Sequence, residues 1–153
     1  MAEQLGRELR GVIGVAARYG DGAPAVVATE PRLPDGSPFP TFYYLTHPLL
    51  TAAASRIEAE GRMVELAELL EDDDTHTAYE AAHLAYIADR DAHGEVAEVA
   101  GISAGGMPTR VKCVHALIGH SLSAGQGVNP IGDVALAWMG WNWETRTLTP
   151  TAE

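Results

Sequence analysis

One stretch of this chain strongly favours a single kind of secondary structure. Residues 75–93 are rich in alanine and contain neither glycine nor proline, so they predict one long helix. At about 100° per residue, the larger polar and aromatic side chains fall within roughly an 80° arc, while another face carries Leu84 and alanines. The side chains of that arc are His76, Tyr79, His83, Tyr86, Ile87 and Arg90. The rest of the fold could therefore cover both faces.

The arc has two interpretations. Tyrosine hydroxyls, imidazoles and a guanidinium on one stripe could coordinate an anion or transfer protons, which makes His83, Tyr86 and Arg90 candidate site residues. Alternatively, the tyrosine rings belong to the core with their polar ends at its rim, and a hydrogen bond satisfies His83. We favour the second interpretation for each residue taken alone.

The first third of the chain has a different pattern. Residues 11–17 and 24–29 are rich in valine and alanine and flank a turn at residues 19–22, which predicts a β-hairpin. Residues 41–46 are aromatic and β-branched and follow a loop rich in proline, so they predict a third strand. We therefore predict an α+β fold, in which a small, mainly antiparallel sheet packs against helices from the rest of the chain.

Shorter helices are expected on both sides of the long one. Their ranges are 2–10, 48 to about 61, 62 to about 70 and 109 to about 123, with a last short helix that contains Trp138 and is capped by Asp133. The tail from about Asn142 is expected to be loosely held. A chain of 153 residues has the usual size of one domain, so we expect a single domain over residues 1–153.

The negative net charge of the chain disfavours two classes of partner, nucleic acids and anionic membranes. A net charge of -11 opposes binding to nucleic-acid backbones and to anionic membranes, because both attract lysine and arginine. Cys113 is the single cysteine, so no disulfide can form within the chain. No segment resembles a signal peptide or reaches the length of a membrane span. We expect a cytoplasmic protein that binds neither nucleic acid nor membrane, and the oligomeric state stays open.

Residues 103–112 are the first candidate site. The members that suggest binding are Ser103, Gly105, Gly106, Arg110 and Lys112. Consecutive glycines let backbone N–H groups turn towards an anion, and a helix that starts near residue 109 would add partial positive charge. Cations in the first turn oppose the helix dipole, so Arg110 and Lys112 suggest an anionic ligand. The alternative is a glycine-rich turn that carries two surface cations.

Cysteine and histidine residues form a second candidate. Cys113, His115 and His120 fall on the helix expected from residue 109, and His47 precedes an earlier helix. In a continuous helix Cys113 and His120 lie roughly 10 Å apart along the axis, and Cys113 and His115 point about 160° apart. Helical chelation needs ligands three or four residues apart, so no two of these three make an ordinary helical chelate. Cys113 is then either a small semi-buried side chain or a nucleophilic thiol that neighbouring cations activate.

Several strings in the sequence resemble one known family. They occupy residues 25–41, 43–48, 102–108, 111–115 and 127–133. The resemblance is to the uncharacterised bacterial domain-of-unknown-function family 501, which is common in actinobacteria, and it extends over roughly residues 8–140. That family has no established activity, so the resemblance implies a group and not a function.

The resemblance also implies a metal site that this chain has largely lost. Family members carry cysteine at the positions of Ala17, often Tyr19, His47 and Cys113, a set that would suit zinc or an iron–sulfur cluster. Here only Cys113 is a cysteine, so both cofactors are disfavoured, and His47 and Cys113 remain weak metal candidates. The family's genes typically lie beside those of a septum-formation initiator-like and an exopolyphosphatase-like protein, which implies a link to cell division or phosphate metabolism.

Two functions follow from these observations. The first is a protein that binds a small anionic ligand, or acts on it as an enzyme, and phosphate-bearing molecules are among the candidate ligands. The ligand would be held by Ser103, Gly105, Gly106, Arg110, Lys112 and Arg90, with His83, Tyr86 and Cys113 as candidate chemical groups. The second is a noncatalytic interaction module for a protein partner in cell division or phosphate metabolism, with a depleted metal site.

Overall fold

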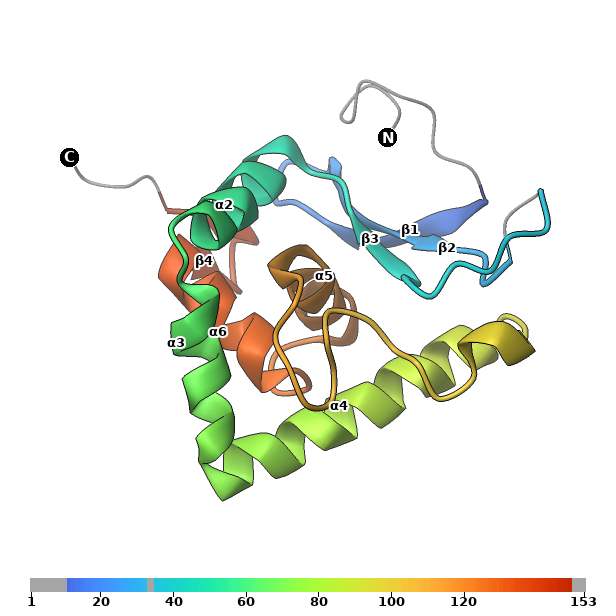
Figure 1. Cartoon of the computed structure of the whole chain (residues 1–153). Coiled ribbons are helices and arrows are strands. Elements are labelled where there is room, and N and C mark those ends of the chain that lie inside the picture. Colours follow the sequence, from blue (N-terminus) through green and yellow to red (C-terminus); the bar gives the residue numbers. More distant parts are fainter. Residues whose placement is uncertain (1–10, 33–34, 150–153) are drawn as a thin grey trace.

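As predicted, the N-terminal third of the chain forms the three-stranded sheet and the helices follow it in the sequence. The computed structural model describes residues 11–32 and 35–149, so the helix expected over residues 2–10 lies outside the described residues. Within these ranges, an antiparallel sheet from the N-terminal third packs against helices from the rest of the chain (Figure 1). The fold is therefore α+β, which confirms the predicted class.

The sheet has three antiparallel strands in the order β1-β2-β3. Their bounds are Val12–Arg18 for β1, Pro24–Thr29 for β2 and Tyr43–Leu45 for β3. Val15 lies opposite Val27, and Val26 lies opposite Leu45. The central strand β2 is buried on both sides, which explains why its sequence is a nearly continuous apolar run instead of an alternating one.

Helices and short 3-10 turns make up most of the remainder. Their bounds are Pro48–Ala59 (α2), Met63–Glu68 (α3), Leu69–Glu71 (η1), Asp73–Asp91 (α4), Ala97–Val99 (η2), Val114–Ala124 (α5) and Pro130–Met139 (α6). The long helix α4 starts two residues earlier than predicted because Asp72 caps it: the Asp72 carboxylate accepts a hydrogen bond from Thr75 N at 2.9 Å.

The helix expected from residue 109 begins five residues later, at Val114. The chain before it forms tight turns in which the carbonyl of Gly106 accepts from Arg110 N at 2.8 Å and that of Gly105 accepts from Lys112 N at 2.7 Å. Gly105 has a φ of 68° and Gly106 a φ of 96°, and residues other than glycine rarely adopt such positive values. Residues 106–112 therefore form turns and not a helix.

The C-terminal part differs from two expectations. Asn129, and not Asp133, caps α6, since its side chain accepts from Gly132 N at 3.0 Å. The segment after Asn142 is not a loose tail, because β4 (Trp141–Asn142) and β5 (Thr147–Leu148) form a hairpin, and Thr149 N donates to the carbonyl of Gly140 at 2.7 Å. Arg146 Nε donates to the carbonyl of Arg18, which ties this hairpin to the end of β1. Residues 150–153 lie outside the described residues.

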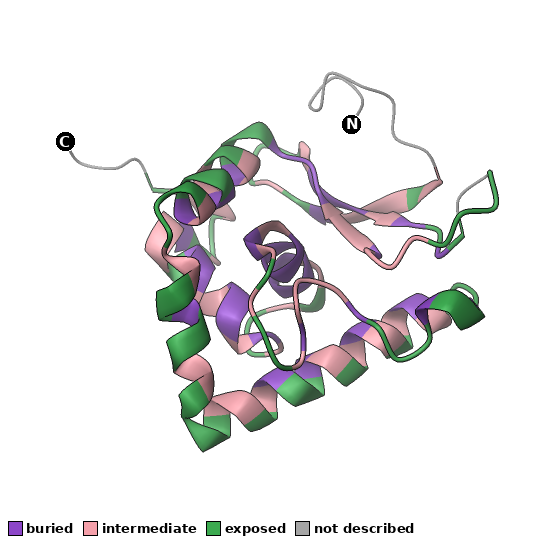
Figure 2. Cartoon of the chain, in the orientation of Figure 1, coloured by how far each residue is buried: buried purple, intermediate pink, exposed green. Residues whose placement is uncertain are grey.

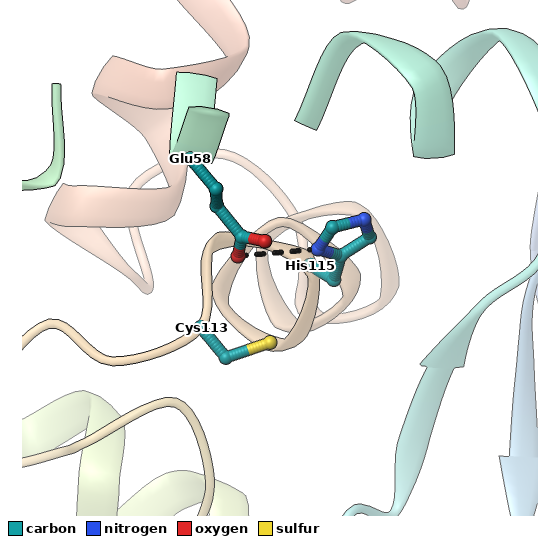
Figure 3. A group of neighbouring side chains, drawn as sticks. All are labelled: Glu58, Cys113 and His115. Carbon is teal, nitrogen blue, oxygen red and sulfur yellow. Dashed lines mark hydrogen bonds and ion pairs between the residues drawn. The ribbon is translucent and has the colours of Figure 1, made fainter. Parts of the chain in front are cut away.

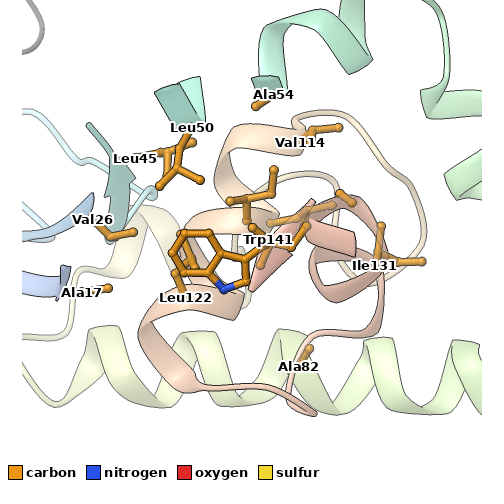
Figure 4. Packing of buried hydrophobic residues seen from close by; sticks show 14 of the residues in the cluster. Ala17, Val26, Leu45, Leu50, Ala54, Ala82, Val114, Leu122, Ile131 and Trp141 are labelled. Carbon is orange, nitrogen blue, oxygen red and sulfur yellow. The ribbon is translucent and has the colours of Figure 1, made fainter. Parts of the chain in front are cut away.

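The helix α5 lies in the middle of the fold, and Figure 2 shows it almost entirely buried. Side chains from the sheet, from α2, from α4 and from α6 point into one cluster around it (Figure 4). Its apolar sequence, with eight of its residues buried from Val114 to Leu122, follows from this position. Within the described residues, no helix combines the length and the apolar character that crossing a membrane requires.

Candidate functional site

A cavity of about 410 Å³ lies between β3, α2, α5 and the turns of residues 103–112. Its lining consists of Thr41, Tyr43, Tyr44, Leu45, Thr51, Gly105, Cys113, His115 and Ala116. This volume is in the range of small-molecule sites, and such sites combine a mainly apolar wall with a few converging polar groups. Here the converging groups are the thiol of Cys113 and the imidazole of His115.

These two side chains meet a carboxylate from another helix. The side chain of Glu58 extends from α2 towards the start of α5, where Cys113 and His115 lie (Figure 3). Oε2 of Glu58 lies 3.2 Å from Nδ1 of His115. One ligand atom from each of the three residues lies within 4.8 Å of those of the other two. A thiol, an imidazole and a carboxylate therefore share one half-buried position.

Both ring nitrogens of His115 have a partner. Nδ1 faces Glu58, and Nε2 lies 3.1 Å from Oγ of Ser55. The hydrogen bond to Cys113 raises the pKa of His115 to about 9, and the Glu58 carboxylate adds to this effect against the lowering effect of burial. The imidazole is therefore protonated at neutral pH and forms an ion pair with Glu58.

The sequence pattern points to Cys113 but gives no role to Glu58. A helix over residues 109–123 would also point Cys113 and His115 apart. In the structure Cys113 precedes α5 with an extended backbone, φ -144° and ψ 107°, so the helical angle between the two does not apply. Glu58 lies 55 positions before Cys113, and no local spacing could indicate that α2 brings it to this point.

The predicted anion cradle is only partly compatible with the structure. Arg110 and Lys112 are exposed, and within residues 11–32 and 35–149 neither forms an ion pair. The backbone N–H groups of Arg110 and Lys112 already donate to Gly106 and Gly105. The helix dipole expected there is absent because α5 starts later. Gly105 itself lines the cavity with Cys113 and His115, so part of the predicted segment does reach the pocket.

The tyrosines of α4 are core residues, as the favoured interpretation held. Tyr79 and Tyr86 are fully buried. The Tyr86 hydroxyl accepts from the backbone N–H groups of Phe42 at 2.6 Å and Tyr43 at 3.1 Å. The Tyr79 hydroxyl donates to the carbonyl of Arg110 at 2.7 Å. Both hydroxyls therefore satisfy backbone groups, and neither tyrosine lines the cavity.

The two remaining polar candidates of α4 also have structural partners. Arg90 is fully buried and donates to the carbonyls of Pro40 at 3.0 Å and Val99 at 2.9 Å. Nδ1 of His83 lies 2.7 Å from Oγ of Ser103, which is itself buried. Burial and the nearby Arg90 charge lower the pKa of His83. These contacts fix the loop after α4 and do not gather at the cavity.

His120, which the sequence analysis considered as a ligand, is a core residue. It is fully buried, with Nδ1 3.1 Å from the side-chain nitrogen of Asn129. Its ring stacks on Tyr43 and meets the edge of Tyr86. Burial lowers its pKa to about 4, although the charge of Asp89 acts in the opposite direction. The ring is therefore neutral at physiological pH.

The metal set that the family resemblance implies does not come together. His47 is the N-cap of α2 and stacks on Tyr19 with ring centroids 4.1 Å apart. Glu58, which contacts the Cys113 region, lies eleven residues further along α2, roughly 16 Å by helical rise. Within the described residues, the group of candidate metal ligands that contains Cys113 is completed by Glu58 and His115, and His47 is not part of it. The residues present here do not fit that site.

Comparison with known proteins identifies the group to which the chain belongs. The sequence model of a family described as "Protein of unknown function (DUF501)" matches residues 15–137. No curated protein and no solved structure shows a significant match. The match includes the whole cavity lining, with Cys113 and His115, and the residue Glu58 on α2. Since it covers most of the 153 residues, the chain is a member of the DUF501 family.

Proposed function

We propose that this protein binds a small organic anion in the cavity between β3, α2 and α5. The observation that carries the proposal is that Gly105, Cys113 and His115 line one cavity of about 410 Å³. Tyr43, Tyr44 and Leu45 give this cavity a wall that suits an apolar or aromatic ligand body. The cavity, and not the isolated turn of residues 103–112, is the place for the ligand.

The charges near the cavity support an anionic group on that ligand. The chain has a net charge of -11, yet Arg110 and Lys112 are exposed directly before Cys113 and unpaired within the described ranges. Within the same ranges, the N–H groups of Gly105 and Gly106 donate to no protein acceptor. Two exposed cations and free backbone donors in residues 105–112 favour a carboxylate or phosphate on the ligand.

The test uses the single cysteine as a reporter. Benzoate, phenyl phosphate and inorganic phosphate are added to the protein, and the melting temperature and the rate of Cys113 alkylation by iodoacetamide are measured. A bound ligand raises the stability by about 2.7 kcal/mol at a hundredfold excess over Kd, and it also shields the thiol. We expect at least one aromatic anion to raise the melting temperature and to slow the alkylation of Cys113. Inorganic phosphate should change both quantities less.

Two pairs of variants locate the binding. Thr51→Phe fills the cavity from α2, whereas Ala52→Phe places the same ring on the next, exposed position. We expect only Thr51→Phe to abolish the stabilisation. Arg110→Ala with Lys112→Ala removes the two exposed cations of the segment that leads to Cys113, and Arg18→Ala with Arg32→Ala makes the same charge change elsewhere. Stabilisation that survives Thr51→Phe, or none with any anion, would rule out this function.

An interaction module remains the second candidate. Such a module needs a contiguous exposed apolar surface. The exposed large apolar side chains of the described residues instead belong to separate segments: Ile13, Leu49, Val64, Leu84 and Ile102. We therefore place the link to a division or phosphate-metabolism partner second, in a cytoplasmic protein whose one thiol is free. If no anion binds, this reading becomes the stronger one.

A further inference from the structure

We propose that Glu58, Cys113 and His115 bind one zinc ion at the wall of the cavity. They are the one group of at least three candidate metal ligands that the described part of the chain brings together. The side chains come from two elements, the end of α2 and the start of α5 (Figure 3). A site of this kind differs from the set at Ala17, Tyr19 and His47, which has no thiolate of its own.

The spacing of the donor atoms suits tetrahedral coordination. Zinc binds imidazole nitrogen and carboxylate oxygen at about 2.0 Å, which places two such ligands about 3.3 Å apart. Nδ1 of His115 and Oε2 of Glu58 lie 3.2 Å apart. A thiolate ligand would lie about 3.6 Å from each of them. Sγ of Cys113 already lies within 4.8 Å of one ligand atom of each of the other two residues, so a change in its side-chain rotation would complete the set.

Two further contacts hold the ligands in place. In metal sites the second nitrogen of a ligating histidine usually donates to an oxygen, which fixes the ring. With zinc on Nδ1, the N–H at Nε2 of His115 faces Oγ of Ser55 at 3.1 Å. The Glu58 carboxylate is fixed in the same way by Val114 N at 2.9 Å. Ser55 and the start of α5 are therefore positioning groups for the proposed ligands.

The donor types select the metal. A thiolate, an imidazole and a carboxylate together favour zinc over magnesium or calcium, which prefer oxygen ligands. A single cysteine cannot hold an iron–sulfur cluster. On binding, the thiol proton and the proton at Nδ1 leave to solvent. Three protein ligands leave a fourth position open, as in catalytic zinc sites, and Cys113 and His115 border the cavity. Only the assignment of that position to an anionic ligand rests on the proposed function.

Cobalt(II) alone, without any organic ligand, tests this site in the full chain lacking an affinity tag. Cobalt replaces zinc and gives a thiolate-to-metal charge-transfer band, which can come only from Cys113 because no other cysteine exists. We expect one cobalt per chain, a band, and its loss on adding one equivalent of zinc. Cys113→Ser removes the band, and Glu58→Gln and His115→Ala each weaken binding at least about tenfold.

Matched variants separate this site from incidental binding. His76 and Glu80 form another histidine–carboxylate pair, 3.2 Å apart, on the exposed side of α4 and without a thiol. The double variant His76→Ala with Glu80→Gln should leave the cobalt spectrum unchanged. Ser55→Ala, at an exposed position of α2, should weaken binding while keeping the band. Circular dichroism checks that Glu58→Gln, whose amide oxygen still accepts from Val114 N, stays folded.

Each outcome decides the proposal. Absence of a band, or a band that persists at full strength in Glu58→Gln and His115→Ala, shows that these residues do not form a zinc site. Anion binding to chelator-treated protein is measured separately with the benzoate assay. If the protein binds cobalt but no anion, the proposed function is wrong and the metal site stands. If it binds an anion but no cobalt, only the metal site is wrong.

Discussion

Oε2 of Glu58 accepts a hydrogen bond from the backbone N–H of Val114 at 2.9 Å. The residue at the N-cap of α5 is Cys113, whose side chain makes no capping hydrogen bond. A carboxylate from α2 therefore supplies the acceptor that the cap residue lacks, and negative charge at a helix N-terminus is favourable. The same oxygen faces His115. One side chain thus starts the central helix and fixes the imidazole at the cavity.

This relationship predicts a difference between two substitutions at Glu58. Glu58→Ala removes the cap and the partner of His115, and we expect it to lower the free energy of unfolding by about 1–2 kcal/mol. Glu58→Gln keeps an oxygen acceptor for Val114 N, so its effect should be less than half as large. Urea denaturation of metal-free protein measures both. Glu60→Ala, an exposed position on the same helix end, is the control and should be nearly neutral.

The parts of the fold that local patterns encode were predictable. The apolar run of β2 and the two-faced sequence of α4 each reflect contacts that repeat within one element. The start of α5 was not predictable in this way, because the turns at Gly105 and Gly106 close on carbonyls within the same segment and delay the helix. The candidate site shares this limit, since it depends on a contact between Glu58 and a residue 55 positions later, Cys113.

The buried His120 predicts acid sensitivity. Its pKa of about 4 in the folded protein is below the ordinary value of 6.5, so the unfolded chain binds the proton more readily. The stabilising contribution is complete above pH 6.5 and is lost as the pH falls towards 4, by roughly 3 kcal/mol. Denaturant midpoints between pH 7 and 4 measure this slope. In His120→Gln, which does not titrate, the slope should be visibly flatter, and an unchanged slope would assign it to other groups.

The Tyr86 hydroxyl predicts a larger effect than that of Tyr79. Tyr86→Phe leaves the N–H groups of Phe42 and Tyr43 without this acceptor in a buried setting, which should cost about 2–4 kcal/mol of unfolding free energy. Tyr79→Phe removes one donor to the carbonyl of the exposed Arg110, which water can replace, and should cost about 1 kcal/mol. Chemical denaturation of the two variants compares them directly. Equal costs would show that the Tyr86 hydroxyl is not needed at the edge of β3.

The contact between α5 and α6 depends on the absence of a side chain at Gly132. A Cβ at this position would fall against the carbonyl oxygen of Leu117 and Oγ of Ser121, closer than real atoms approach. Both partners belong to the buried central helix, so neither can move without disturbing the core. Gly132→Ala should therefore lower the free energy of unfolding by at least about 2 kcal/mol, although alanine is normally the better helix former. The control is Gly14→Ala in β1, where an added Cβ meets nothing within 4 Å. Thermal denaturation should separate the two variants clearly. If Gly132→Ala were as stable as Gly14→Ala, α5 and α6 would have to pack at a greater distance than the structure shows.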